Sequence, residues 1–245
     1  MEEPASRARG KPIHIDVSQP LPKTAFIMGD PARVEMLLEY VGGGRVLSRK
    51  RGYIVALVEN KQGSIVLASH GIGGPSMLIL VEELSMLGTR RFVRLGTTGA
   101  FSGDLKVGDV LIAASACMIP KTCGLSLYYE EVPPPLSADI RLAERAFGLL
   151  KGAGLEPRLA RVFCSDSFYA ESWEIFQRAA AAGCHAVDME TASLYGISAL
   201  RGLESVSVLV VSNVIRELGE EVGSGEVLSK KFKAVFRALL PLAFD

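Results

Sequence analysis

The stretch of the sequence best suited to chemistry is Arg94-Leu95-Gly96-Thr97-Thr98-Gly99-Ala100, which follows Arg91-Phe92-Val93, the end of a predicted strand. Glycines let a backbone approach a ligand closely, while exposed N–H groups and threonine hydroxyls donate hydrogen bonds. Arg94 adds a planar guanidinium that can bind an oxyanion through two hydrogen bonds. The pattern predicts a strand that ends in an anion-binding turn. The alternative is a tight turn after a buried strand, with Arg94 paired to a neighbouring acid.

Five other groups of polar residues and glycines follow predicted strands, and ligands bind at the carboxyl ends of strands in open α/β sheets. These groups are Gly29-Asp30-Pro31-Ala32-Arg33, His70 to Ser76, Ser165 to Tyr169, Asp188-Met189-Glu190 and Ser212-Asn213. Two arginines and two glycine-rich turns suit a phosphate, an aromatic pair suits a flat ring, and a carboxylate suits sugar hydroxyls. Each residue alone could have a structural role, as Glu190 has through the helix dipole, but together the groups indicate a binding site.

The pattern of apolar residues predicts the strands and helices that must position these groups. Strands are expected at residues 24–28, 53–58, 64–68, 91–93, 110–114, 159–163, 186–188 and 205–211, and helices at 31–41, 77–87, 138–151, 173–181, 190–200 and 226–240. Because strands and helices alternate, we predict an α/β fold with a mixed, largely parallel central sheet flanked by helices. We expect a single domain over residues 13–245, after a polar N-terminal tail at residues 1–12.

The composition limits the partners of the protein. Among 245 residues, 27 Lys and Arg balance 27 Asp and Glu, and the basic residues form no stripe, so we expect no nucleic-acid partner. No apolar run approaches the length of a membrane span, and the N-terminus lacks the pattern of a signal peptide. We therefore expect a cytoplasmic protein that does not bind membranes.

The cysteines and histidines give no sign of a metal centre. Cys117, Cys123, Cys164 and Cys184 lack C-x-x-C spacing, and the three histidines are scattered singly. Free thiols are the expectation for a cytosolic protein, and a link between Cys117 and Cys123 across a loop is the alternative.

Taken together, the motifs resemble the nucleoside phosphorylase family, which contains hexameric purine nucleoside phosphorylases, uridine phosphorylases and archaeal-type methylthioadenosine phosphorylases. The matching motifs are Gly29-Asp30-Pro31-x-Arg33, His70-Gly71-Ile72-Gly73-Gly74-Pro75-Ser76, Glu82-Glu83-Leu84, Arg94-x-Gly96-Thr97-Thr98-Gly99-Ala100, Val107-Gly108-Asp109, Ser165-Asp166-x-Phe168-Tyr169 and Met189-Glu190. The resemblance spans residue 13 to the last helix. It implies a nucleoside phosphorylase-like fold and the reversible cleavage of a nucleoside by phosphate to free base and ribose 1-phosphate, with phosphate as co-substrate and no cofactor.

The resemblance also implies roles for single residues. The phosphate ligands would be Gly29, Arg33, Arg94 and Thr97, the ribose ligands Met189 and Glu190, and the base ligands Phe168, Ser212 and Asn213. We expect Glu190, Arg94 and Asn213 to take part in catalysis. The transition state should resemble an oxocarbenium ion, which the phosphate and Glu190 would both stabilise.

In the resembled family each site borrows residues from a neighbouring subunit. His14 matches the borrowed histidine at the 5′ side of the ribose. The borrowed arginine, a phosphate ligand, is Arg51 or Arg49. The resemblance therefore implies a homo-oligomer, a dimer at least and a hexamer by family habit.

The sequence departs from the family's pattern where the base is recognised. Ser212-Asn213 stands where purine enzymes usually carry Ser-Asp, and an asparagine cannot act as a general acid at neutral pH. Glu226 lies near the place of the arginine that assists this aspartate. Asparagine occurs in uridine phosphorylases, but their Gln-x-Arg is replaced by Ala170 to Glu174, which resembles the methylthioadenosine branch.

Purine nucleosides are therefore favoured as substrates, with 6-oxopurines suited to an amide, and a uridine phosphorylase is the alternative. Two further alternatives are a nucleosidase, which uses water, and a non-catalytic nucleoside-binding protein. Because a nucleosidase needs no phosphate site, the presence of both Arg33 and Arg94 argues against it.

Overall fold

The computed structural model describes residues 11–101 and 104–244, so most of the predicted tail 1–12 lies outside the described residues. The strands are β1 Thr24–Met28, β2 Arg45–Lys50, β3 Tyr53–Asn60, β4 Gly63–Ser69, β5 Arg91–Ala100, β6 Val110–Met118, β7 Arg158–Cys164, β8 Ala186–Asp188, β9 Glu204–Arg216 and β10 Gly219–Val222. The helices are α1 Pro31–Tyr40, α2 Gly74–Met86, α3 Ile140–Gly152, α4 Trp173–Ala181, α5 Thr191–Arg201 and α6 Gly225–Leu239, with short 3-10 turns η1 Phe168–Ala170 and η2 Leu240–Ala243. The predicted α/β fold class is confirmed.

The strands form one mixed sheet, part of which closes into a barrel. In the described residues the order is β10-β9-β6-β7-β8-β5-β1-β4-β3-β2, and β9 pairs in addition with β5. Strands β5, β9, β6, β7 and β8 therefore form a closed ring, from which β1, β4, β3 and β2 extend. The predicted mixed sheet is present, and antiparallel pairs such as β5–β8 and β6–β9 occur beside parallel pairs such as β1–β5 and β6–β7.

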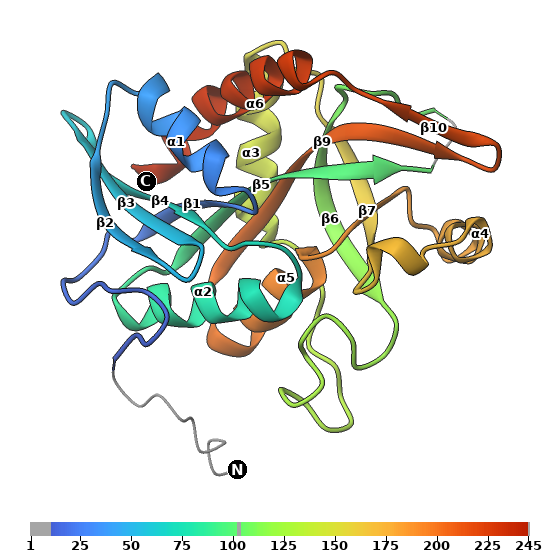
Figure 1. Cartoon of the computed structure of the whole chain (residues 1–245), viewed down its shortest axis with the longest axis horizontal. Coiled ribbons are helices and arrows are strands. Elements are labelled where there is room, and N and C mark those ends of the chain that lie inside the picture. Colours follow the sequence, from blue (N-terminus) through green and yellow to red (C-terminus); the bar gives the residue numbers. More distant parts are fainter. Residues whose placement is uncertain (1–10, 102–103, 245) are drawn as a thin grey trace.

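Helices cover both faces of the sheet (Figure 1). Helices α1, α3 and α6 lie on one side, and α2 and α5 lie together on the other. Helix α6 buries Phe232, Val235, Phe236 and Leu239, and the Phe236 ring packs edge-on against Phe26 of β1, with centroids 5.2 Å apart. In the part of the chain described, no helix is long and apolar enough to cross a membrane.

Two helix starts follow directly from local sequence. The Asp30 side chain accepts a hydrogen bond from the Ala32 N–H at 2.8 Å, and Pro31 fits the first turn of α1, where no N–H is needed. Gly73, before α2, has φ of +88°, which a residue with a side chain rarely adopts. These caps bring Arg33 and the Gly71–Gly73 loop to the same edge of the sheet.

Strands β5 and β9 are longer than predicted, and this changes the nature of the site. The predicted turn at Gly96 to Gly99 is part of β5, and Ser212-Asn213 lies inside β9 rather than after it. The two strands pair in parallel from Arg91 opposite Glu204 to Ala100 opposite Val214, with one register shift between Thr98 and Gly99. Residues with weak strand propensity are held extended because the partner strand supplies the hydrogen bonds.

Strands β2 and β10 were not predicted. Most residues of β2 and all residues of β10 are exposed, so neither strand shows the alternation of buried and exposed residues that marks a strand in a sequence. Each forms the outer strand of an antiparallel hairpin, β2 with β3 and β10 with β9.

Candidate active site

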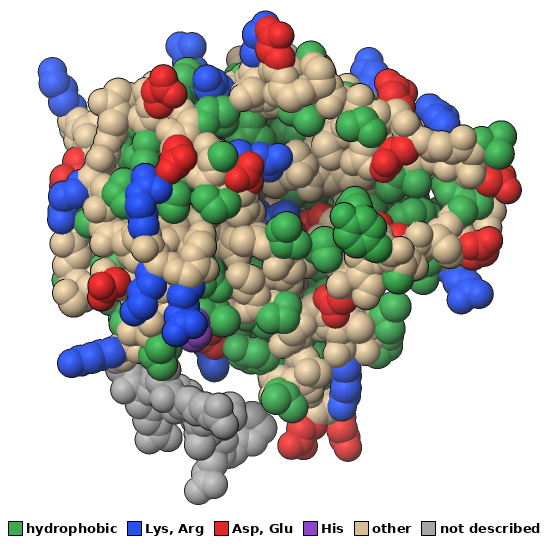
Figure 2. Space-filling model, viewed as in Figure 1, with side chains coloured by type: hydrophobic (Ala, Val, Ile, Leu, Met, Phe, Trp, Pro, Cys, Tyr) green, Lys and Arg blue, Asp and Glu red, His purple; other side chains and the backbone are tan. Residues whose placement is uncertain are grey.

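A pocket of about 980 Å³ opens where the ends of β1, β5, β8 and β9 meet the loops after β4 and β7. Figure 2 shows a hollow near the middle of the viewed face, with charged side chains inside it. Most of the predicted site residues line the pocket: Gly29, Arg33, Arg94, Thr97, Phe168, Met189, Glu190, Ser212 and Asn213. The tertiary structure thus brings together residues that are far apart in the sequence.

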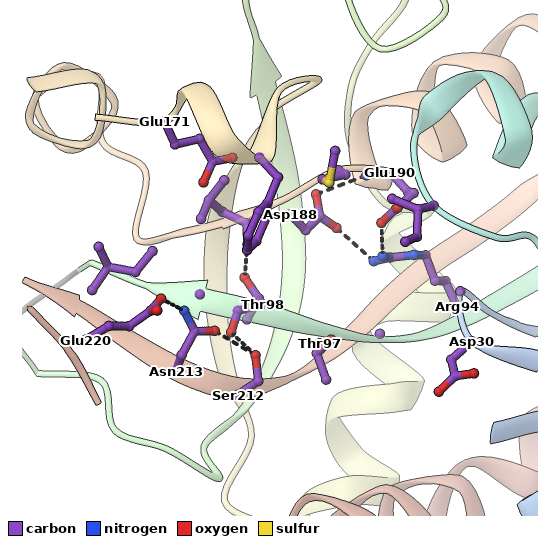
Figure 3. Close-up of a pocket in the computed structure, with 18 of the residues that line it drawn as sticks. Asp30, Arg94, Thr97, Thr98, Glu171, Asp188, Glu190, Ser212, Asn213 and Glu220 are labelled. Atoms are coloured by element: carbon purple, nitrogen blue, oxygen red, sulfur yellow. Dashed lines mark hydrogen bonds and ion pairs between the residues drawn. The ribbon is translucent and has the colours of Figure 1, made fainter. Parts of the chain in front are cut away.

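Arg94 lies at the centre of a buried ion-pair network (Figure 3). Its side chain is 3% exposed, Nη1 donates to Asp188 Oδ2 at 2.7 Å, and Nη2 donates to Glu190 Oε2 at 2.5 Å. Burial alone would lower the pKa of Arg94, but the charges of Asp188 and Glu190 raise it above its usual value. Arg94 is therefore paired with acids, as the alternative interpretation of this residue expected. The same guanidinium also lines the pocket, so it can contact a ligand.

Arg33 lies beside Arg94 at the same end of the pocket. Its guanidinium sits 4.6 Å from the centroid of the Phe232 ring in α6. Burial lowers the pKa of Arg33, the Asp30 carboxylate opposes this, and the charge of Arg94 lowers it further. Two guanidinium groups whose positive charges repel each other at one end of a pocket form a favourable site for a dianion.

Gly96 makes room for the Arg94 side chain. A Cβ atom at Gly96 would lie 2.7 Å from Arg94 Nη1 and 2.7 Å from Leu209 Cδ2. Any larger residue would displace the guanidinium or the β9 side chain. The glycine of the motif is therefore required for Arg94, rather than for a turn.

Glu190 stands between the arginines and the Gly71–Gly73 loop. One carboxylate oxygen accepts from the Gly73 N–H at 2.7 Å and the other from Arg94. Burial raises the pKa of Glu190, and the charge of Arg94 acts in the opposite direction. Glu190 is the N-cap residue of α5, but its side chain makes no capping hydrogen bond, so the helix-dipole interpretation does not account for its contacts.

Asp188 belongs to one of the predicted groups at strand ends, but sequence reasoning gave it no role. Besides Arg94, its carboxylate accepts hydrogen bonds from Thr191 Oγ1 at 2.5 Å and, more weakly, from the Thr191 N–H at 3.3 Å. The side chain is 1% exposed. Asp188 positions Arg94, and its place at the end of β8, directly before Met189-Glu190, was the available signal.

His70 directly follows β4 and interacts electrostatically with Arg94 and Arg33, but does not itself line the pocket. It is fully buried, and neither ring nitrogen has a hydrogen-bond partner among the described residues. Burial and then the charge of Arg94 hold the pKa of His70 well below its usual range. The imidazole therefore adds no charge to this end of the pocket at neutral pH.

The other end of the pocket carries Phe168, Ser212 and Asn213. Phe168 is 61% exposed and packs edge-on against Tyr169 with ring centroids 5.3 Å apart. Ser212 Oγ donates to Asn213 Oδ1 at 2.7 Å, and Asn213 Nδ2 donates to the Glu220 carboxylate. Glu226 does not line the pocket, since it lies on α6 and pairs with Lys230 at 2.7 Å.

Glu171 and Glu220 also line the pocket, although sequence reasoning gave neither a role. Glu220 was missed because its position depends on the β9–β10 hairpin, which the sequence pattern did not reveal.

His14 and Arg51 lie outside the pocket of their own chain. His14 Nδ1 is 2.6 Å from Glu83 Oε1 on α2, and the same carboxylate accepts from the backbone N–H groups of residues 13–15. Arg51 occupies the exposed turn between β2 and β3 with φ of +53°, whereas Arg49 pairs with Glu35 at 2.6 Å. Their sharing with a neighbouring subunit stays a prediction.

The four cysteines are free thiols, and the considered Cys117–Cys123 link is absent. Cys117 Sγ instead lies 2.8 Å from Cys184 Sγ, and Cys123 Sγ lies 3.6 Å from the carbonyl oxygen of Cys164. Within residues 11–101 and 104–244, no group of three or more His, Cys, Asp or Glu side chains could hold a metal ion.

Comparison with known proteins identifies the family of the chain. The chain is 30% identical over 236 residues to the DeoD-type purine nucleoside phosphorylase of Brevibacillus brevis, covering 95% of this chain and 97% of the relative. It is 30% identical over 210 residues to the guanosine phosphorylase of Halorubrum lacusprofundi, covering 85% and 86%. The solved structure of the Toxoplasma gondii purine nucleoside phosphorylase in complex with immucillin-H matches with a TM-score of 0.82, 24% identity and 97% and 98% coverage, and so shares the fold. Residues 23–241 match the phosphorylase superfamily, and the chain therefore belongs to that superfamily.

Proposed function

We propose that this protein is a purine nucleoside phosphorylase, which uses inorganic phosphate to cleave a nucleoside to free base and ribose 1-phosphate. The observation that carries the proposal is the pair Arg33 and Arg94 at one end of a pocket, with Glu190 paired to Arg94 there. Relatives named purine nucleoside phosphorylase and guanosine phosphorylase, each covered over most of its length, support the purine class.

Phosphate binds between the two arginines, beside Gly29 and Thr97. Because Asp188 holds Nη1 of Arg94, the guanidinium keeps its orientation when the Glu190 carboxylate moves away and a phosphate oxygen takes its place at Nη2. Positioning the dianion against the anomeric carbon is most of what this reaction needs. Arg51 or Arg49 of a second subunit adds a further positive charge.

Glu190, released from Arg94, accepts hydrogen bonds from the ribose hydroxyls above Met189. A phosphate oxygen attacks C1′ as the bond from C1′ to the base nitrogen breaks, and its electron pair leaves with the base. Positive charge develops on the sugar, and the phosphate and the Glu190 carboxylate stabilise it. Asn213 donates to the departing base, which stacks on Phe168.

The proposed assembly is a homo-oligomer, a dimer at least and a hexamer by family habit. The position of His14 and Arg51 outside the pocket of their own chain supports this, since both could complete the pocket of a neighbour. A cytoplasmic location suits an enzyme that acts on nucleosides and phosphate, without a bound cofactor.

A panel of nucleosides, each with and without phosphate, tests the proposal. We expect release of free base and ribose 1-phosphate from guanosine, inosine or adenosine only when phosphate is present. Cleavage of uridine alone would move the protein to the pyrimidine branch. Turnover that is undiminished in phosphate-free buffer would identify a nucleosidase instead.

A further inference from the structure

Two glutamates that the reaction above does not use, Glu171 and Glu220, line the base end of the pocket. In Figure 3 both lie at the end opposite to Arg94. Glu171 follows the η1 turn, and Glu220 lies on β10, opposite Ile215 of β9. Two carboxylates beside the base are unexpected, because the departing base gains negative charge and nearby carboxylates would repel it.

Glu220 determines which way the Asn213 amide faces. A carboxylate only accepts hydrogen bonds at neutral pH, so the amide nitrogen, not the oxygen, must face Glu220. The amide oxygen then accepts from Ser212 Oγ at 2.7 Å, as observed. One Nδ2 hydrogen remains for the ligand. Asn213 is therefore a fixed donor, which requires an acceptor on the base.

Glu171 offers the complementary group. Its Oε1 atom is buried and has no hydrogen-bond partner among the described residues. Burial raises the pKa of Glu171, a hydrogen bond with Ser165 lowers it, and the charge of Glu220 raises it. A buried acceptor without a donor is unfavourable, and an N–H group of a ligand would satisfy it. Arg216 also lines the pocket, but its side chain is exposed.

We propose that Glu171 and Glu220 make the pocket selective for 6-oxopurine nucleosides, and above all for guanosine; this rests on the proposed function. Asn213, positioned by Glu220, donates to O6 or N7, while Glu171 accepts from N1–H and from the 2-amino group of guanine. Adenine carries an unprotonated acceptor at N1, which would face the Glu171 carboxylate. Glu171 is thus a specificity residue and Glu220 a positioning residue.

The test measures kcat and KM with phosphate for guanosine, inosine, 1-methylinosine and adenosine. The variants are Glu171→Gln and Glu220→Gln, with Glu221→Gln as the control, because Glu221 neighbours Glu220 on β10 but does not line the pocket. Wild type should prefer guanosine and inosine to adenosine and should cleave 1-methylinosine, which lacks N1–H, poorly.

The two variants should act differently. Glu171→Gln should lower kcat/KM for guanosine by about 10- to 100-fold and leave adenosine within about 3-fold, because only the N1–H and 2-amino contacts are lost. Glu220→Gln should reduce the guanosine-to-adenosine ratio, and Glu220→Asp should restore part of it. Glu221→Gln should match wild type.

Wild type that prefers adenosine, or that cleaves 1-methylinosine as fast as inosine, would overturn this inference and leave the phosphorylase function standing. Equal losses for all nucleosides in both variants would do the same. Failure of every purine nucleoside to react with phosphate would refute the proposed function itself. If the variants do not fold, the rates at which the wild-type enzyme cleaves inosine and 1-methylinosine are sufficient to test the inference.

Discussion

Replacement of Glu190 by glutamine tests the centre of the proposed reaction. Glutamine has nearly the same shape, and its single amide oxygen can accept either from the Gly73 N–H, a contact of 2.7 Å in the structure, or from Arg94 Nη2, but not from both. What the change removes is the negative charge 2.5 Å from Arg94 Nη2. Arg94 keeps its other acidic partner, Asp188, so no uncompensated buried cation is created. The fold should therefore remain intact.

The size of the effect follows from where the charge acts. Removing one preorganised group that stabilises transition-state charge costs about 2.7–4 kcal/mol, or about 10²- to 10³-fold in kcat. The affinity for phosphate should not fall together with kcat. Because Glu190 pairs with the arginine that must bind phosphate, its neutral replacement removes a competing anion and should leave phosphate binding unchanged or tighter.

The pH dependence gives a second readout of the same carboxylate. Burial raises the pKa of Glu190 above its ordinary value. The ionised form is the active one, so wild-type kcat should fall as the pH drops through this raised pKa, at a higher pH than an exposed glutamate would show. Glu190→Gln should lose this acidic limb.

The assay measures initial rates of guanosine and inosine cleavage against phosphate concentration and pH. Glu226→Gln is the control, since Glu226 is exposed and pairs only with Lys230 among the described residues. Near-normal turnover of Glu190→Gln would remove Glu190 from the mechanism. A clearly weaker affinity for phosphate would contradict the competition between Glu190 and phosphate for Arg94.

Three further predictions concern residues that support the site. Asp188→Asn should raise the KM for phosphate, because Nη1 of Arg94 loses the charged partner that fixes its orientation. Initial rates against phosphate concentration measure this, and an unchanged KM would mean that Asp188 does not position Arg94. Gly96→Ala should displace Arg94 and destabilise the fold by about 1–3 kcal/mol. Gly148→Ala is the control, because an added Cβ at Gly148 meets nothing within 4 Å and should have neither effect. Equal melting temperatures of the two variants would refute the steric argument. Burial acts to raise the pKa of Glu83, but hydrogen bonds from His14 and the backbone N–H groups of residues 13–15 lower this pKa below its ordinary value of 4.5. The stability that the ionised Glu83 side chain contributes is therefore present above pH 4.5 and is lost as the pH falls through the lowered pKa. Hydrogen exchange should then show residues 13–15 less protected at low pH in wild type, and at all pH values in Glu83→Gln; protection that is independent of pH in wild type would contradict this.

Local sequence was sufficient where short-range physics dominates. The cap at Asp30, the proline in the first turn of α1 and the apolar stripe of Val34, Leu37 and Leu38 predicted that helix, and the structure has it at Pro31–Tyr40. The predicted strand 186–188 coincides with β8. Strands that are buried or paired at both sides are detectable because their apolar runs reflect their burial.

Strand ends and edges depended on partners that lie far away in the sequence. The residues Gly96 to Gly99 and Ser212-Asn213 have the composition of turns, yet β5 and β9 hold each other extended through them. The five-stranded ring likewise closes through pairs such as Gly99 with Val187 and Val110 with Val210. No local pattern encodes these pairings, because their hydrogen bonds form only once the whole sheet is assembled.

The sequence by itself determined most of the residues that line the pocket: glycines, two arginines, an acidic helix start and an amide, all in or directly after the carboxyl-terminal parts of strands. Only the tertiary structure decided how their charges are arranged. It paired Arg94 with Asp188 and Glu190, left Glu171 Oε1 without a partner, and brought Glu220 from an exposed hairpin to Asn213. Charge interactions depend on distance and burial, and both are properties of the folded chain rather than of any segment of it.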